Sequence, residues 1–171
     1  MSPIAPYDAR AIANFLLDVA DERKLACTQL LLYKLIYFAH GWYLSFFDKP
    51  LVRQDFEAWK RGPVVKVVRD EFRAFKKNPI NIRAQRLDIY TGKREIVEPI
   101  LDDNDRRFIL QVFNSYYHYG AWNLSEMTHE AGSPWDSLWN SPEPIGRLAL
   151  RIKNREIKAH FDGLADRLTI S

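Results

Sequence analysis

The chain has 171 residues, of which 47% are hydrophobic and 13% aromatic, and its net charge is +3. This composition supplies a sizeable core and excludes a disordered chain, so we expect one domain over residues 1–171. The single cysteine, Cys27, excludes an internal disulfide framework and favours a reducing compartment. The N-terminal residues show no basic region followed by an apolar one, so we find no export signal and expect a cytoplasmic protein.

The first two predicted elements are helices. Residues 8–23 have apolar side chains at helical spacing, which predicts an amphipathic helix. Residues 28–47, with Thr28 as the N-cap, are apolar on nearly every side, a pattern typical of a membrane span or of the buried centre of a domain. Lys34 and His40 interrupt this apolar run, so we place the helix at the centre of the domain and expect no membrane partner.

A short strand and a basic helix are predicted next. Residues 55–59 alternate between polar and apolar side chains, which favours an extended segment. Gly62 and Pro63 then form a turn, and Pro63 suits the first position of a helix over residues 63–77. Apolar side chains recur every three or four positions along this helix and should pack on the core. Basic side chains recur in the same rhythm on another side, at Lys66, Arg69, Arg73 and Lys76.

The middle of the chain predicts a hairpin and two helices. Residues 79–100 favour a β-hairpin because Gly92 separates two runs with strand-forming side chains. A helix should follow over residues 102–118, with an aspartate as its cap and Gly120 ending it. Another helix is predicted over residues 123–131.

The C-terminal part predicts two further helices and a strand. Ser133 is a suitable N-cap for a short helix that begins with proline. Residues 148–152 alternate as in a brief strand, which would pair with residues 55–59 or with the hairpin. Asn154 would cap a last helix that reaches Leu168. Together these elements predict an α+β fold that is predominantly α-helical, a single compact domain around the central aromatic helix with a small β-hairpin or short sheet.

The sequence holds no recognisable catalytic or metal-binding motif. No spacing of histidines and cysteines matches a zinc site, and there is neither a phosphate-binding loop nor a nucleophile elbow. Folding could bring Cys27 and His129 together, but a lone cysteine beside a helix is more typical of a small buried residue. His40 is most simply a core histidine with a hydrogen-bond partner. We expect no catalytic residue, metal or cofactor, and a hydrolase that uses Cys27 or a histidine stays open as an alternative.

Positive charge is concentrated in residues 60–94. This segment contains three acidic and eleven basic residues, a net charge of +8 that leaves −5 for the rest of the chain. The basic residues are Lys60, Arg61, Lys66, Arg69, Arg73, Lys76, Lys77, Arg83, Arg86, Lys93 and Arg94. Such a region could be a solvated surface, a site for nucleic-acid phosphates, or a surface that attracts an acidic protein.

Three segments together resemble one protein family. Residues 35–44 read LIYFAHGWYL, residues 57–65 read EAWKRGPVV, and residues 124–130 read LSEMTHE and are followed by Pro134 and Trp135. In order and spacing they are similar to the Panacea domain, also called the SocA-like or phage-associated GepA-like family. The resemblance implies a mainly helical α+β domain that is the antitoxin of a bacterial or phage toxin–antitoxin system. It also implies direct binding to a cognate toxin encoded by an adjacent gene, and no enzymatic activity.

The residues that match the family pattern are Tyr37, His40, Gly41, Trp42, Glu57, Trp59, Gly62, Pro63, His129 and Trp135. We interpret most of them as scaffold, with Glu57 able to pair with Lys60, Arg61 or His40. The toxin-binding residues are expected on the exposed side of residues 60–77, at Arg61, Lys66, Arg69 and Arg73. The alternative function is a nucleic-acid-binding regulator that uses residues 60–94. Neither the identity of the toxin nor a homo-oligomeric state follows from the sequence.

Overall fold

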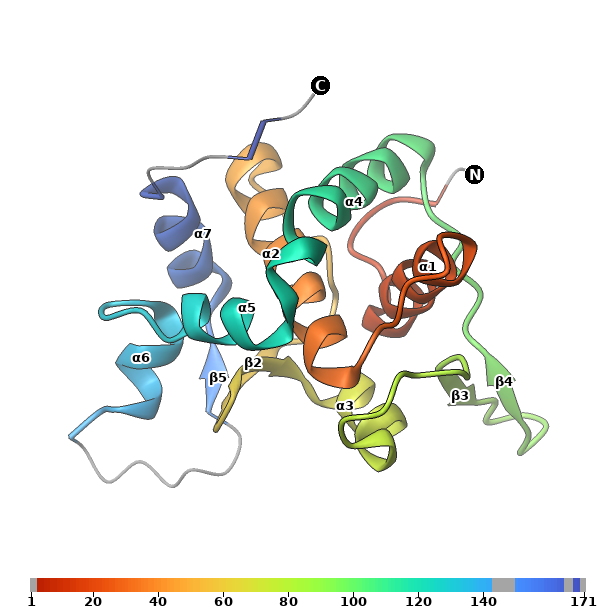
Figure 1. Ribbon diagram of the computed structural model, residues 1–171. Helices are drawn as coiled ribbons and strands as arrows, with labels where there is room; N and C mark the ends of the chain where they lie inside the picture. Colours follow the sequence, from red (N-terminus) through yellow and green to blue (C-terminus); the bar gives the residue numbers. More distant parts are fainter. Residues whose placement is uncertain (1–2, 143–149, 165–167, 170–171) are drawn as a thin grey trace.

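The computed structural model describes residues 3–142, 150–164 and 168–169, and the structural statements below concern these residues. In chain order the elements are α1 (Ala9–Glu22), α2 (Gln29–Phe47), β1 (Phe56–Trp59), β2 (Gly62–Val65), α3 (Lys66–Phe72), the 3₁₀ turn η1 (Arg73–Phe75), β3 (Gln85–Leu87), β4 (Arg94–Ile96), α4 (Asp103–Tyr116), the 3₁₀ turn η2 (Tyr117–Tyr119), α5 (Gly120–Thr128), α6 (Pro134–Trp139), β5 (Arg151–Ile152) and α7 (Asn154–Asp162). Helices make up most of the fold and the strands form small sheets (Figure 1). The predicted fold class, a predominantly helical α+β fold, is confirmed.

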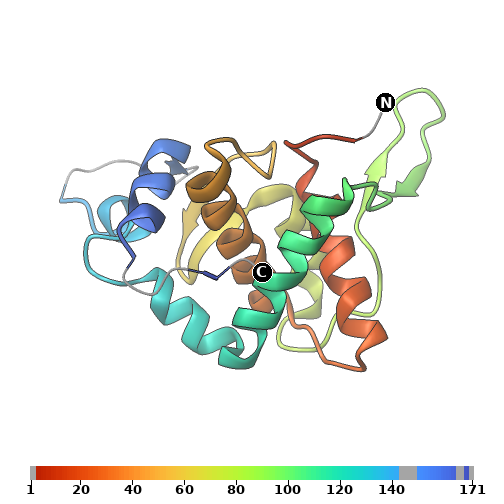
Figure 2. The same ribbon diagram turned by 90° about the horizontal axis from the view of Figure 1, so that it is seen from above.

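Helix α2 lies at the centre, with α1, α4, α5 and α7 around it (Figures 1 and 2). Every residue from Leu31 to Leu44 is buried, as expected for a helix that is apolar on all sides. The Thr28 hydroxyl accepts a hydrogen bond from the Leu31 amide and caps the helix, and Asp48 ends it with a φ of 53°. Across residues 3–142 and 150–164, no helix is long and apolar enough to cross a membrane. The predicted central helix is confirmed.

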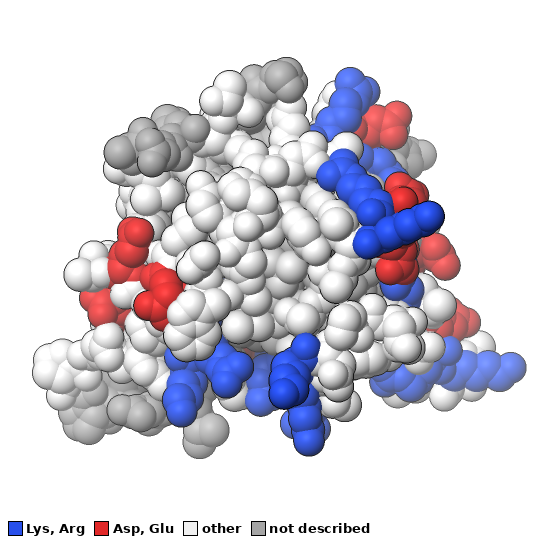
Figure 3. Space-filling model, in the orientation of Figure 1, with Lys and Arg blue, Asp and Glu red and all other residues white. Residues whose placement is uncertain are grey.

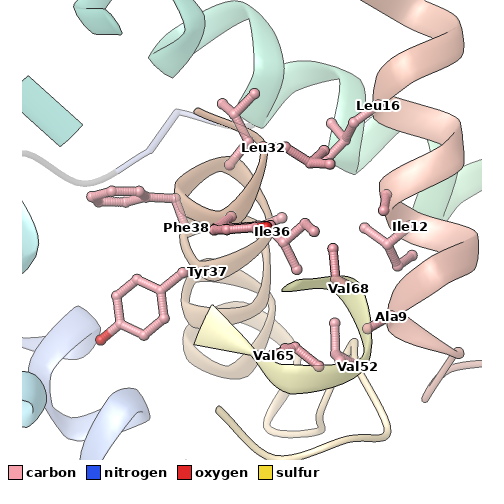
Figure 4. Packing of buried hydrophobic residues seen from close by; sticks show 14 of the residues in the cluster. Ala9, Ile12, Leu16, Leu32, Ile36, Tyr37, Phe38, Val52, Val65 and Val68 are labelled. Atoms are coloured by element: carbon pink, nitrogen blue, oxygen red, sulfur yellow. The ribbon is translucent and has the colours of Figure 1, made fainter. Parts of the chain in front are cut away.

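Part of the core forms where α1, α2 and the β2–α3 segment meet (Figure 4). Its side chains, which are 0–3% exposed, include Ile12, Leu16, Leu32, Ile36, Val65 and Val68. Burying one such aliphatic side chain contributes about 1.5 to 3 kcal/mol, so these contacts fix the position of the β2–α3 segment against α2.

A three-stranded antiparallel sheet has the strand order β2-β1-β5. Phe56 of β1 pairs with Val65 on one side and with Ile152 on the other. The predicted strand over residues 55–59 is therefore confirmed. Of the two partners left open for the predicted C-terminal strand, residues 55–59 and the hairpin, β5 pairs with the first. Leu148, which belonged to that predicted strand, lies outside the described residues.

The predicted helix over residues 63–77 is wrong at both ends. Pro63 lies in strand β2, opposite Ala58 of β1, and the helix runs only from Lys66 to Phe72 before a 3₁₀ turn. Pairing with β1 decides the conformation of residues 62–65. Their local sequence allows this, because two consecutive valines favour an extended segment and proline is tolerated in an edge strand. Gly62 permits the sharp two-residue connection between the strands with its φ of 105°.

Strands β3 and β4 form the predicted hairpin, with Gln85 opposite Ile96 and Gly92 in the connection. The hairpin projects from the body of the molecule (Figure 2). The next predicted helix is also present, because the Asp102 side chain accepts a hydrogen bond from the Asn104 amide and caps α4.

The C-terminal helices differ from their predicted bounds. Helix α5 begins directly at Gly120 and ends at Thr128, so both of its ends lie about three residues before the predicted ones. Ser133 caps α6 as predicted, by accepting a hydrogen bond from the Asp136 amide. Asn154 does not cap α7, because its side-chain oxygen is bonded to His40, and α7 ends at Asp162.

Candidate partner-binding site

The histidine of the central helix is an internal connection between elements. His40 is fully buried; its Nδ1 accepts a hydrogen bond from the Val52 amide at 3.2 Å, so its Nε2 carries the proton and donates to Asn154 Oδ1 at 2.8 Å. Burial lowers the pKa of His40 to about 4, because the charged imidazolium is deprived of water. A neutral histidine with both nitrogens occupied has no free group for a partner.

Three other motif residues of α2 lie equally deep. Tyr37 packs edge-to-face on Phe56 and Phe161, with ring centroids 5.4 and 5.7 Å away. Trp42 is fully buried and donates from its indole to the Tyr116 hydroxyl at 2.6 Å. A Cβ atom at Gly41 would overlap the Phe161 ring, so glycine is what allows α7 to approach α2 closely. These side chains hold the core together and do not reach the surface.

A second buried group lies under the β1–β2 hairpin. The fully buried Lys34 amine donates to the Pro63 carbonyl at 2.9 Å, and burial lowers the pKa of Lys34 to about 7. A Cβ atom at Gly62 would lie 2.6 Å from the Lys34 amine and 2.5 Å from the Thr128 hydroxyl. Only glycine fits between α2, β2 and α5 at this point. In the sequence, Lys34 served only as evidence against a membrane span, because it interrupts an apolar helix. The same interruption was a local sign that this lysine makes a buried polar contact.

The remaining motif residues fix the hairpin from the other side. His129 and Trp135 stack with ring centroids 3.8 Å apart, and the Trp135 indole donates to the Trp59 carbonyl at 2.7 Å. The pKa of His129 is lowered by burial and by the nearby Lys34. Its Nε2 atom is buried without a hydrogen-bond partner among the described residues. The predicted pairing of Glu57 with His40 or with the basic turn is wrong, since Glu57 accepts from the Trp59 indole at 3.0 Å.

A surface groove of about 230 Å³ opens beside this hairpin. It is lined by Gln29, Leu30, Tyr33, Trp59, Lys60, Arg61, Val64, Arg69 and Lys76. The Arg69 guanidinium lies 4.2 Å from the centre of the Trp59 ring, a cation–π contact that orients both side chains. The lining therefore combines apolar and aromatic side chains with four cationic ones and contains no carboxylate.

The groove includes some of the predicted binding residues. Arg61 and Arg69 line it, whereas Lys66 and Arg73 do not. Lys66 is neutralised by Asp70 one helical turn away, at 2.5 Å, and Arg73 is exposed at the start of η1. Sequence reasoning missed the α2 side of the groove, because nothing local indicates that residues 29–33 lie beside the hairpin.

A larger hollow, of about 970 Å³, lies between α1, α3 and the β3–β4 hairpin. Its charged groups are mostly paired with one another. Arg83 donates to Asp18 and Asp21, and Arg94 donates to Glu71. This hollow therefore offers little free charge to a ligand, unlike the groove at Trp59, and we take the groove as the candidate site.

Neither a metal nor a cysteine nucleophile is supported by the described geometry. In the described part of the chain no three His, Cys, Asp or Glu side chains are grouped so that they could hold a metal ion. Burial raises the pKa of Cys27 to about 12, which keeps the thiol protonated, and the thiol donates a hydrogen bond to the Thr28 carbonyl. The geometry does not join Cys27 to His129.

A buried polar scaffold that holds a cationic, aromatic groove at its surface is typical of a protein whose function is binding. Residues 32–136 match the family described as "Antitoxin SocA-like, Panacea domain". The chain is 41% identical over 154 residues to "Antitoxin SocA" of Caulobacter vibrioides (strain NA1000 / CB15N), an alignment that covers 90% of this chain and 82% of that protein. The chain therefore belongs to the SocA-like Panacea family of antitoxins. No solved structure matches it significantly.

Proposed function

We propose that this protein is an antitoxin that neutralises its cognate toxin, the product of an adjacent gene, by direct protein–protein binding. The carrying observation is the 41% identity to Antitoxin SocA over 90% of the chain. We further propose that residues 1–171 act as one domain and that neutralisation involves no catalysis.

The groove at Trp59 supports this proposal because its composition suits an interface. Arginine and tryptophan are the side chains that most often concentrate binding energy between proteins, and Arg69 and Trp59 are already held together. We place the toxin contacts at Arg61 and Arg69 in the groove, and at Lys66 and Arg73 on the exposed side of α3 and η1. The motif residues then act through the scaffold.

A nucleic-acid-binding regulator is the second candidate, and the +8 charge of residues 60–94 favours it. Among the described residues, Lys60, Arg61 and Lys76 take part in no ion pair and are available to phosphates. Binding to duplex DNA should then weaken steeply with salt and should fall when Lys60, Arg61 and Lys76 are all changed to alanine. Unchanged DNA binding by that variant would argue against this candidate.

The decisive experiment expresses the adjacent reading frame alone and together with this protein. Toxicity should appear in the first case and disappear in the second, and the two products should purify as a complex. Titration of purified antitoxin into a toxin assay separates binding from catalysis. Direct binding predicts that neutralisation is complete at a fixed molar ratio of antitoxin to toxin. A catalytic antitoxin would neutralise the toxin at a much lower ratio. Absence of rescue on co-expression would overturn the proposal.

A further inference from the structure

The groove adjoins a second, uncharged surface. Residues 108–125 contain no Lys, Arg, Asp or Glu, and neither do residues 25–33. In the view of Figure 3 the middle of this face, over α5 and the N-terminal part of α2, is free of charged side chains, and Lys and Arg gather along its lower margin. Trp122 of α5 is 68% exposed, and Tyr119 of η2 is 43% exposed. A tryptophan this exposed is unusual in a surface that stays in water.

Hydrogen bonds connect the uncharged face to the groove. The Ser125 hydroxyl of α5 donates to the Arg61 carbonyl at 2.8 Å, and the Tyr117 hydroxyl donates to the Ala26 carbonyl at 2.8 Å. The N-terminal turn of α2 contributes Leu30 and Tyr33 to the groove itself. The face of η2 and α5 and the groove at Trp59 are therefore held in a fixed relation to each other.

The chemistry of this surface selects its occupant. We propose, resting on the proposed function, that the toxin docks across the groove and the η2–α5 face with a segment in which carboxylates flank an apolar side chain. The apolar side chain enters the groove against Trp59 and Tyr33, and the carboxylates meet Lys60 and Arg61 at its rim. Trp122 packs against an adjoining apolar part of the toxin. Arginine suits this task because its planar guanidinium can bind a carboxylate through two hydrogen bonds.

A nucleic acid fits the same surface less well. A phosphate backbone needs cations along its whole length, but the middle of this face carries no Lys or Arg, which lie at its margins together with carboxylates (Figure 3). The groove of about 230 Å³ holds one or two side chains and does not extend as a track for a polymer.

The test compares two variants of the surface with two matched controls. Trp122→Ala should weaken binding to the purified product of the adjacent gene about 30-fold, as expected for an interface anchor. Arg61→Glu should weaken it about 10-fold and reduce its salt dependence. The controls are Tyr90→Ala, at a tyrosine that is 93% exposed on the β3–β4 connection, and Arg155→Glu, at an exposed residue of α7. Both should bind as wild type, and all four variants should keep the wild-type melting temperature.

The outcomes separate the two proposals. If wild type binds and neutralises the product of the adjacent gene and both surface variants bind it equally well, the docking surface is overturned. The proposed function then still stands. Wild type that fails to bind that product overturns both. A third outcome is that the two surface variants lose affinity for a DNA duplex but bind the toxin as wild type does. That result would identify a nucleic-acid site and also overturn the docking surface. Overlapping peptides of the toxin provide a second readout, because the peptide that binds wild type but not Arg61→Glu should carry carboxylates beside an apolar residue.

Discussion

The buried amine of Lys34 should make the stability of this protein rise with pH. Burial lowers the pKa of Lys34 to about 7 from the ordinary value of 10.5. Between these two values the unfolded chain binds more protons than the folded chain, so the free energy of unfolding increases with pH in this window. Each pH unit can raise the free energy of unfolding by at most about 1.36 kcal/mol. Because the amine in the folded protein is half charged at pH 7, the rise from pH 7 to pH 9 is about 2 kcal/mol.

Urea unfolding of wild type and Lys34→Met at pH 7, 8 and 9 measures this gain. Methionine keeps the length of the side chain but does not titrate, so wild type should gain about 2 kcal/mol relative to the variant across the window. Lys66→Met is the matched control, because that lysine side chain is 59% exposed and its removal should leave the slope unchanged. A difference between wild type and Lys34→Met that does not change with pH would mean that the buried amine stays charged, and it would refute the reasoning.

Three further predictions concern the scaffold. His40 has a pKa of about 4 in the folded protein and an ordinary value of 6.5, so on acidification the unfolded chain takes up the proton first. In urea titrations the free energy of unfolding of wild type should therefore fall by about 3 kcal/mol between pH 7 and pH 4, relative to His40→Gln. Gly41→Ala should cost about 1 to 3 kcal/mol or more by forcing α7 away from α2. Gly163→Ala should melt as wild type, because its added Cβ atom would lie 3.6 Å from the Ala159 and His160 carbonyl oxygens. Trp42→Ala should cost about 3 to 5 kcal/mol in the same assay and lose toxin binding through unfolding, and retained stability with selective loss of binding would contradict a core role.

Elements with a strong local pattern were predictable from the sequence. Helices α1, α2 and α4 combine apolar periodicity with a capping side chain, and both signals lie within a few residues of each other. Strand β2 was not predictable in this way, because Pro63 suits the start of a helix as well as an edge strand. Pairing with Ala58 of β1 decided between them. Asn154 was misassigned for a similar reason, since its partner His40 lies in a helix far away in sequence.

The candidate site was predictable only in part. The motif drew attention to Trp59 and to the arginines beside it, and the structure brings Arg61 and Arg69 into one groove. The pairing of Lys66 with Asp70 follows from their spacing of four residues and could have been used to give Lys66 less weight. Leu30 and Tyr33 could not be found, because their place in the groove depends on how α2 packs beside the hairpin.

The way the scaffold holds the β1–β2 hairpin explains how a fixed core can support an adaptable surface. Lys34 binds the Pro63 carbonyl, Ser125 binds the Arg61 carbonyl, and Trp135 binds the Trp59 carbonyl. All three hydrogen bonds go to backbone oxygens, so none of them depends on the side chains at positions 60 and 61. Exchanging Lys60 or Arg61 should therefore leave the hairpin in place and change only what the groove presents to a partner. We infer that these buried groups fix the shape of the site and that, under the proposed function, the exposed side chains select the toxin.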